Sequence, residues 1–263
     1  MLLKKRGLCL RKIVHKNKTR MKAIYVKELQ QFFSSLIGYI TIIVFLVVTG
    51  LFLWVFPDTN ILDFGYASMD YFFYIAPFIL LFLIPAITMR SFAEEMNTGT
   101  IELLSTKPVS DWDILLGKYF AALTLVLVAL APTLVYWYTV YNLALPIGNV
   151  DMGGTAGSYF GLIFLAAVFC AIGVFCSSIT TNQIVSFVAG VFLSFFLYLA
   201  FENLSKLGIL FAKNDYLVES LGLNAHYSSM SRGVVDSRDV VYFLSVISLF
   251  LLFTRTSLAS KKW

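Results

Sequence analysis

The segment MRSFAEEMNTGTIELLSTKPVSDWDILLGK, residues 89–118, is a polar stretch that separates two long apolar ones. It carries five acidic side chains and three basic ones: Glu94, Glu95, Glu102, Asp111, Asp113, Arg90, Lys107 and Lys118. Turn and capping residues stand at both of its ends, as they do where helices begin and stop. We therefore predict one or two short helices, held at a membrane surface and shaped to contact another protein.

Capping signals inside this segment predict a short helix that lies crosswise between two membrane helices. Gly99 interrupts the helix that continues from the preceding apolar stretch. Thr98 or Thr100 can cap a new helix over residues 101–106 by accepting backbone N–H bonds, and Pro108 ends it. A solvated loop is the alternative, but a loop of this length with its own helix is usually functional. The predicted contact surface has two apolar and three acidic members: Leu103, Leu104, Glu94, Glu95 and Glu102.

The composition of the whole chain is that of an integral membrane protein. Of its 263 residues 59% are hydrophobic and 13% are charged, with a mean hydropathy of +0.82. A soluble domain is about 45–50% apolar and about 25% charged, so an ordinary soluble globule is excluded. The net charge of +5 does not indicate nucleic acid as a partner, because the basic residues cluster beside apolar runs.

Six apolar runs predict an all-α membrane protein with six transmembrane helices. They cover about residues 36–56, 71–88, 119–143, 159–176, 184–201 and 240–258. The first run would extend about 30 Å as a helix, the thickness of a hydrocarbon core. Pro77, Pro85 and Pro132 are expected to kink or break their helices. Ser110 and Asp113 form an S-x-x-D capping box that opens the third membrane helix.

The N-terminal part of the chain is strongly basic. Residues 1–20 are predicted to be an extension of low structural content that precedes a transmembrane domain over 21–263. Apolar residues between Met21 and Ser35 recur at helical spacing, which predicts an amphipathic helix in the lipid headgroup layer. A helical stub that leads into the first span is the alternative.

The distribution of Lys and Arg predicts the orientation. With six spans, most of the 20 basic residues fall on the side that holds both termini and residues 89–118. The positive-inside rule places that side in the cytoplasm. Residues 202–239, between the fifth and sixth spans, contain apolar pieces too short to cross a membrane. We expect them to dip into the outer leaflet or to lie on it.

No catalytic or metal-binding pattern is present in the sequence. The two histidines, His15 and His226, have no ligand partner at helical spacing, and the three cysteines fit apolar packing. The phosphate-binding motif G-x-x-x-x-G-K-[ST] is missing, and no Asp, Glu, Lys or Arg lies inside the predicted spans, apart from Arg255 in the possible extension of the sixth span beyond residue 253. Ion-coupled carriers need such charges near the midplane. We therefore expect no cofactor on this chain, and a separate ATPase as its source of free energy.

Small residues recur four apart along the fifth span, at Ser186, Gly190 and Ser194. Such ridges let helix backbones approach each other closely. Packing within the chain is the first interpretation, and an interface with another subunit is the alternative.

The segment from Ser91 to Ser110 resembles the E-E-x-x-x-G-T-x-E-L-L-x-T-x-P-V-S signature of type-2 ABC exporter permeases. In that family this signature forms the coupling region between the second and third spans. From Met21 onward the chain also resembles the permeases of bacterial gliding-motility ABC transporters. This likeness rests on MKAIYVKE, KPVSDWDILLGKY and HYSSMSRGVVDSRDVVYFL, which begin at residues 21, 107 and 226.

The resemblance implies a six-span permease of the bacterial inner membrane with an interfacial N-terminal helix and cytoplasmic termini. It implies two ATPase subunits, which use ATP and Mg, and a second permease that is a different chain. The ATPase contact would comprise Glu94, Glu95, Gly99, Thr100, Ile101, Glu102, Leu103 and Leu104. The alternative is a membrane anchor or force-transmitting subunit of a motility or secretion machine that translocates nothing.

Overall fold

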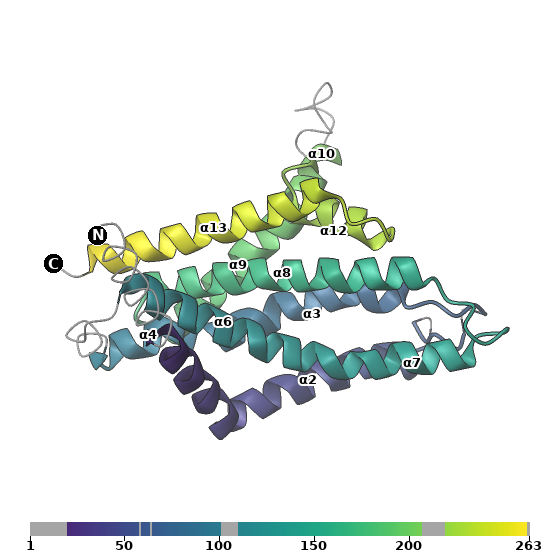
Figure 1. Ribbon diagram of the computed structural model, residues 1–263, viewed down its shortest axis with the longest axis horizontal. Coiled ribbons are helices and arrows are strands. Elements are labelled where there is room, and N and C mark those ends of the chain that lie inside the picture. Colours follow the sequence, from purple (N-terminus) through teal and green to yellow (C-terminus); the bar gives the residue numbers. More distant parts are fainter. Residues whose placement is uncertain (1–19, 58, 64, 101–109, 207–218, 262–263) are drawn as a thin grey trace, which may run out of the picture.

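The computed structural model describes residues 20–57, 59–63, 65–100, 110–206 and 219–261, and these residues form a bundle of helices (Figure 1). Within those ranges there is no β-strand. The prediction of an all-α membrane protein is confirmed. The predicted helix over residues 101–106 and the extension before Arg20 lie outside the described residues, as does the middle of the predicted outer segment, residues 207–218.

Within the described ranges, five helical runs are long and apolar enough to cross a membrane. These are α3–α4 (Asp70–Thr88 and Arg90–Asn97), α6–α7 (Asp111–Leu130 and Leu134–Leu143), α8 (Met152–Ile179), α9–α10 (Gln183–Phe195 and Phe201–Lys206) and α13 (Ser237–Ser260). The N-terminal helix Arg20–Ser34 and α2 (Leu36–Trp54) meet at a bend of 67°. Counted together as one broken span, they form a sixth run. A shorter helix, α12 (Leu223–Ser231), precedes α13.

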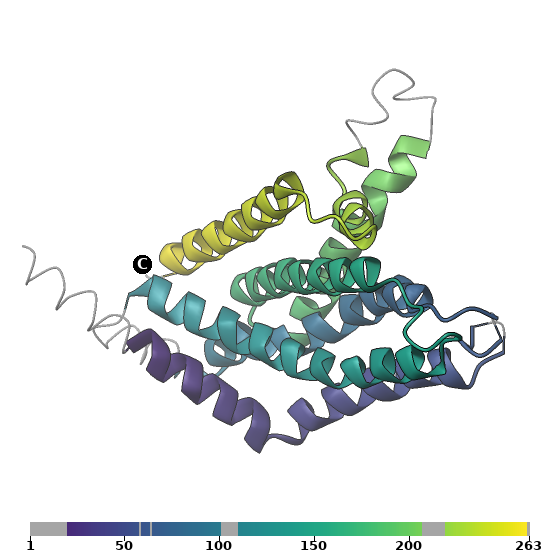
Figure 2. The same cartoon turned by 45° about the vertical axis from the view of Figure 1, so that its right-hand side comes forward.

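Helix α8 forms the centre of the bundle (Figures 1 and 2). It packs against α3, α4, α6, α9, α12 and α13, and its side chains are the most thoroughly buried of the five runs. Small residues on α8 allow this. A Cβ added to Gly173 would overlap the hydroxyl of Thr88 on α3, and one added to Gly161 would lie 3.0 Å from the Tyr227 ring on α12.

The two ends of the bundle are formed by different helices and connections. The "α4 end" holds α4, the start of the N-terminal helix, the start of α6 and the end of α13 (Figure 1). The "opposite end" holds α10, α12 and the connections from α2 to α3 and from α7 to α8 (Figures 1 and 2). Residues from widely separated parts of the sequence therefore meet at the α4 end.

Local residue types explain where several helices begin and break. The Ser110 hydroxyl accepts a bond from Asp113 N, and the Asp113 carboxylate accepts one from Ser110 N, so the predicted capping box is confirmed. This cap starts α6 at Asp111, well before the apolar run begins at residue 119. Proline 132 lies in a 3₁₀ turn, Ala131–Thr133, that separates α6 from α7 as expected. The π-helical turn Phe196–Ala200 between α9 and α10 was not predicted.

Candidate functional site at helix α4

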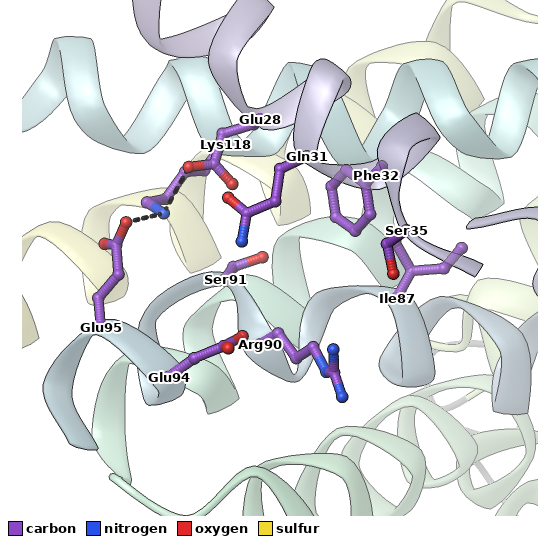
Figure 3. A pocket seen from close by; sticks show the side chains of 10 residues that line it. All are labelled: Glu28, Gln31, Phe32, Ser35, Ile87, Arg90, Ser91, Glu94, Glu95 and Lys118. Atoms are coloured by element: carbon purple, nitrogen blue, oxygen red, sulfur yellow. Dashed lines mark hydrogen bonds and ion pairs between the residues drawn. The ribbon is translucent and has the colours of Figure 1, made fainter. Parts of the chain in front are cut away.

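A buried lysine links three helices at the α4 end. Lys118 of α6 is 2% exposed, and its ammonium nitrogen lies 2.9 Å from Glu28 Oε1 and 2.9 Å from Glu95 Oε1. Figure 3 shows both carboxylates directed at this nitrogen, one from the N-terminal helix and the other from α4. A buried charge is tolerated when it is paired in this way. The lysine therefore joins α6, α4 and the N-terminal helix through a single group.

A second lysine lies at the solvent-exposed side of these charges. Lys27, which is 58% exposed, has its nitrogen 3.5 Å from Glu95 Oε1 and 3.7 Å from Glu28 Oε1. An exposed pair of this kind contributes about 0–1 kcal/mol, much less than the buried contacts beneath it. We define the "ion cluster" as Glu28, Glu95, Lys118 and Lys27.

Helix α4 begins with a cap that comes from another helix. It follows α3 after Met89, and none of its own neighbouring side chains caps its first turn. The Ser177 hydroxyl of α8 accepts bonds from Phe92 N at 2.9 Å and Ala93 N at 3.0 Å, and it donates to Met89 O at 2.9 Å. Because the first N–H groups of a helix lack intrahelical partners, this hydroxyl fixes the start of α4 to α8.

The C-terminal end of α13 also contacts α4. The Lys261 ammonium donates to Ser178 O at 2.8 Å and Ile179 O at 3.0 Å, which are among the last carbonyls of α8. It also lies 3.1 Å from Met96 Sδ on α4. Partial burial lowers the pKa of Lys261 below its ordinary value. A lysine at the end of a helix satisfies carbonyls that the helix leaves free, so α13, α8 and α4 are held together here.

Helix α4 ends at Asn97, and Gly99 follows it at the place where the sequence predicts an interruption. Gly99 has a φ of +70°, a left-handed conformation that favours glycine. The Thr98 hydroxyl donates to Glu94 O at 2.8 Å, and the Thr100 hydroxyl donates to Glu95 O at 3.3 Å. Both hydroxyls thus bond to carbonyls of α4. The remaining residues predicted for the ATPase contact, Ile101, Glu102, Leu103 and Leu104, lie outside the described residues.

Glu94 and Glu95 are adjacent in the sequence but lie in different surroundings. The Glu95 side chain is 14% exposed and belongs to the ion cluster. Glu94 is partly exposed and makes no ion pair in the part of the chain that the structure describes. It lines a small pocket of about 90 Å³ together with Gln31, Arg90 and Ser91 (Figure 3). Glu95 is therefore placed to stabilise the site, whereas Glu94 remains accessible to another protein.

The small-residue stripe on α9 faces the interior of this chain. Ser186, Gly190 and Ser194 are buried, and a Cβ added to Gly190 would lie 3.2 Å from Pro85 Cβ on α3. Gly190 lies where α9 crosses α3 and α8, since the added Cβ would also lie 3.9 Å from Gly173 Cα, so packing within the chain accounts for this position. The interface with a second permease stays a prediction. The exposed side of α9 carries large apolar residues instead: Ile184, Val185, Val188, Phe192 and Phe195.

Several residues of the site were not predicted. Lys118 and Glu28 counted only as charges of the sequence, and Ser177 only as a small residue. A lysine at the edge of an apolar run is the sole signal that the sequence offered for the ion cluster. Within the described residues, no three His, Cys, Asp or Glu side chains are grouped to hold a metal ion.

Comparison with known proteins adds one match. The family model described as ABC-2 family transporter protein matches residues 18–261, which is nearly the whole chain. The comparison with curated proteins gives no match.

Proposed function

We propose that this chain, which belongs to the ABC-2 transporter family, is a permease subunit through which a separate ATPase moves membrane helices by displacing α4. Family membership makes it a membrane permease subunit of an ABC transporter. The observation that carries the coupling proposal is the arrangement at α4. This short helix extends a membrane-spanning run and is bonded to α6, α8, α13 and the N-terminal helix.

The contacts of α4 determine what its displacement would move. Ser177 ties its start to the central helix α8, and Lys118 ties Glu95 to α6 and the N-terminal helix. A force on α4 would therefore reach several helices at once. Buried pairs of this kind are expensive to break, since separation leaves an uncompensated charge. We expect the cluster to persist while the helices tilt.

In this proposal ATP and Mg are bound and used by the partner ATPases, two per complex. Their closure would displace the segment that follows α4, and α4 with it. The prolines inside α3, Pro77 and Pro85, remove backbone hydrogen bonds and let that helix bend. Bending of this span, with the N-terminal helix and α2 following, would open or close a pathway shared with a second permease.

The α4 end is proposed to face the cytoplasm of a bacterial inner membrane. The support is the excess of Lys and Arg on that side. Glu94, Gly99 and Thr100 are the described residues proposed to meet the ATPase, with Ile101, Glu102, Leu103 and Leu104 beyond them. The resemblance to gliding-motility permeases supports a role in such a complex, with a different chain as the second permease.

The test is a charge reversal at Glu94. The tagged chain with Glu94→Lys is purified from native membranes, and the ATPase that accompanies it is quantified by mass spectrometry. We expect at least a tenfold loss of ATPase, equal to about 1.4 kcal/mol of binding. Asp63→Lys is the matched control, because Asp63 is an exposed acid near the opposite end. Equal recovery of ATPase with both variants would reject α4 as the contact.

A further inference from the structure

A second cavity lies at the opposite end of the bundle, away from α4. Its volume is about 460 Å³, and it lies between α3, the α9–α10 run and α12. Cavities of about 300–1,000 Å³ are typical of small-molecule sites. Neither the ion cluster nor the family match assigns a role to this cavity.

The π-helical turn Phe196–Ala200 contributes one wall. A π turn inserts an extra residue into a helix and occurs often at functional sites. Here it carries Tyr198, which is 3% exposed and packs its ring edge-on to Phe78 with 5.8 Å between ring centroids. The Tyr198 hydroxyl lines the cavity without a hydrogen bond to any part of the chain that the structure describes. A hydroxyl in the wall of a cavity whose donor and acceptor sites are free of the described chain is one of the few polar groups that orient a ligand in such a site.

The opposite wall is held in place by α12. The Tyr227 hydroxyl donates to Phe73 O at 2.8 Å, so α12 is fixed to α3 across the floor of the cavity. Tyr74 and Phe78 follow on the same face of α3, with 5.7 Å between their ring centroids. Together with Tyr198 they present a continuous aromatic surface.

The charged side chains that line the cavity are both acids, among the residues described. Glu202 is bonded to Lys206 at 2.6 Å and to Asn224 Nδ2 at 2.5 Å, so its charge is largely compensated. Asp70, at the start of α3, has no ion-pair partner within the described ranges. Because no Lys or Arg within the described ranges lines this cavity, and the Lys206 ammonium is already bonded to Glu202, an anionic ligand would meet the Asp70 carboxylate without a free cation to offset it.

We propose that this cavity binds an organic cation, an ammonium group on an apolar body. The ammonium would lie between the Asp70 carboxylate and the rings of Tyr74 and Phe78, where ring faces attract a cation. An N–H of the ammonium would donate to the Tyr198 hydroxyl oxygen. The apolar body would cover the aromatic surface. This inference concerns the opposite end and does not depend on the ATPase contact at α4.

Equilibrium dialysis of the purified full-length protein in detergent tests the proposal with three probes. These are phenethylammonium, phenylacetate as an anion of similar shape, and maltose as a neutral polyol. We expect phenethylammonium to bind at least tenfold more tightly than the other two. Equal or tighter binding of phenylacetate or maltose would overturn the proposal.

Two substitutions locate the site. Asp70→Asn is expected to weaken phenethylammonium binding about tenfold, whereas Asp63→Asn, outside the cavity, leaves it unchanged. Tyr198→Phe keeps the ring and removes the hydroxyl. It should weaken phenethylammonium but not benzyltrimethylammonium, which has no N–H to donate. Since the hydroxyl makes no bond within the described chain, this variant should fold, and its melting temperature is measured alongside. Unchanged phenethylammonium binding in both Asp70→Asn and Tyr198→Phe would overturn the assignment.

The cation could belong to a free amine or to a lipid headgroup. The dialysis is therefore repeated in nanodiscs of phosphatidylethanolamine and of phosphatidylglycerol. Weaker phenethylammonium binding in phosphatidylethanolamine than in phosphatidylglycerol shows that the ethanolamine headgroup competes for the site, and identifies the headgroup as the source. Equal phenethylammonium binding in both membranes identifies a free amine. Either result supports an organic cation as the ligand, and loss of binding in phosphatidylglycerol alone would contradict it.

Discussion

The ammonium nitrogen of Lys118 on α6 lies 2.9 Å from Oε1 of Glu95 on α4. The same nitrogen lies 2.9 Å from Glu28 of the N-terminal helix. One buried cation thus compensates two buried acids drawn from separate elements. Its removal should affect all three elements at once.

Lys118→Met keeps the length and apolar stem of the side chain but removes its charge. We expect a loss of about 3–5 kcal/mol of stability, because buried Glu28 and largely buried Glu95 would lose their buried cation and keep only the longer contacts with exposed Lys27. Thermal unfolding in detergent measures the loss. Lys22→Met, at an exposed lysine of the same helix as Glu28, is the control and should change stability by less than about 0.5 kcal/mol.

Neutralising the whole group provides a second check. The triple variant with Lys118→Met, Glu28→Gln and Glu95→Gln should recover much of the stability lost in Lys118→Met, since the only charge of the cluster that remains, on Lys27, is exposed to solvent. If the triple variant is less stable than Lys118→Met, the loss does not arise from uncompensated charge.

Ser177→Ala removes the cap that α8 gives to α4. Two buried N–H groups, of Phe92 and Ala93, would lose their acceptor, at a cost of about 1–3 kcal/mol. Hydrogen exchange followed by mass spectrometry should show faster exchange in α4. Ser248→Ala removes an exposed hydroxyl that bonds only within α13 and should leave α4 unchanged. Unaltered exchange of α4 in Ser177→Ala would contradict the assigned cap.

Gly173→Ala tests the close crossing of α8 and α3. The new Cβ would overlap the Thr88 hydroxyl, so we expect destabilisation of about 1–3 kcal/mol. Adding Thr88→Ala removes that hydroxyl and should restore part of the loss, as neighbouring sites are not additive. Full additivity of the two substitutions would show that this contact does not limit the packing.

Gly99→Ala places a side chain in a left-handed conformation at the end of α4. No atom lies within 4 Å of the added Cβ, so the cost is backbone strain of about 1–2 kcal/mol. Gly99→Asn should cost less, because asparagine tolerates this region. We expect faster hydrogen exchange in the last turn of α4 in Gly99→Ala than in Gly99→Asn. Equal exchange would argue against a left-handed Gly99.

Features that depend on neighbouring residues were predictable from the sequence. Hydropathy indicated the membrane class, and the capping box at Ser110 and Asp113 and the helix end at Gly99 follow from residues a few positions apart. Proline at 132 indicated the break in the third span for the same reason.

Contacts between distant residues were not predictable. The partners of Lys118 come from two other helices, and the cap on α4 comes from Ser177, 85 residues beyond Phe92. The pattern at Ser186, Gly190 and Ser194 indicated close packing but did not say which helix it meets. In the structure Gly190 approaches Pro85 of α3 and Gly173 of α8, which are far from it in the sequence.

The most direct measurement of the central claim is photo-crosslinking from α4 in the assembled transporter. A benzoylphenylalanine encoded at position 94 is irradiated in native membranes, and the same residue at position 63 reports the opposite end. The coupling proposal predicts an adduct with a nucleotide-hydrolysing subunit from position 94 and none from position 63. An adduct from position 63, or none from position 94 in complexes that contain the ATPase, would contradict it.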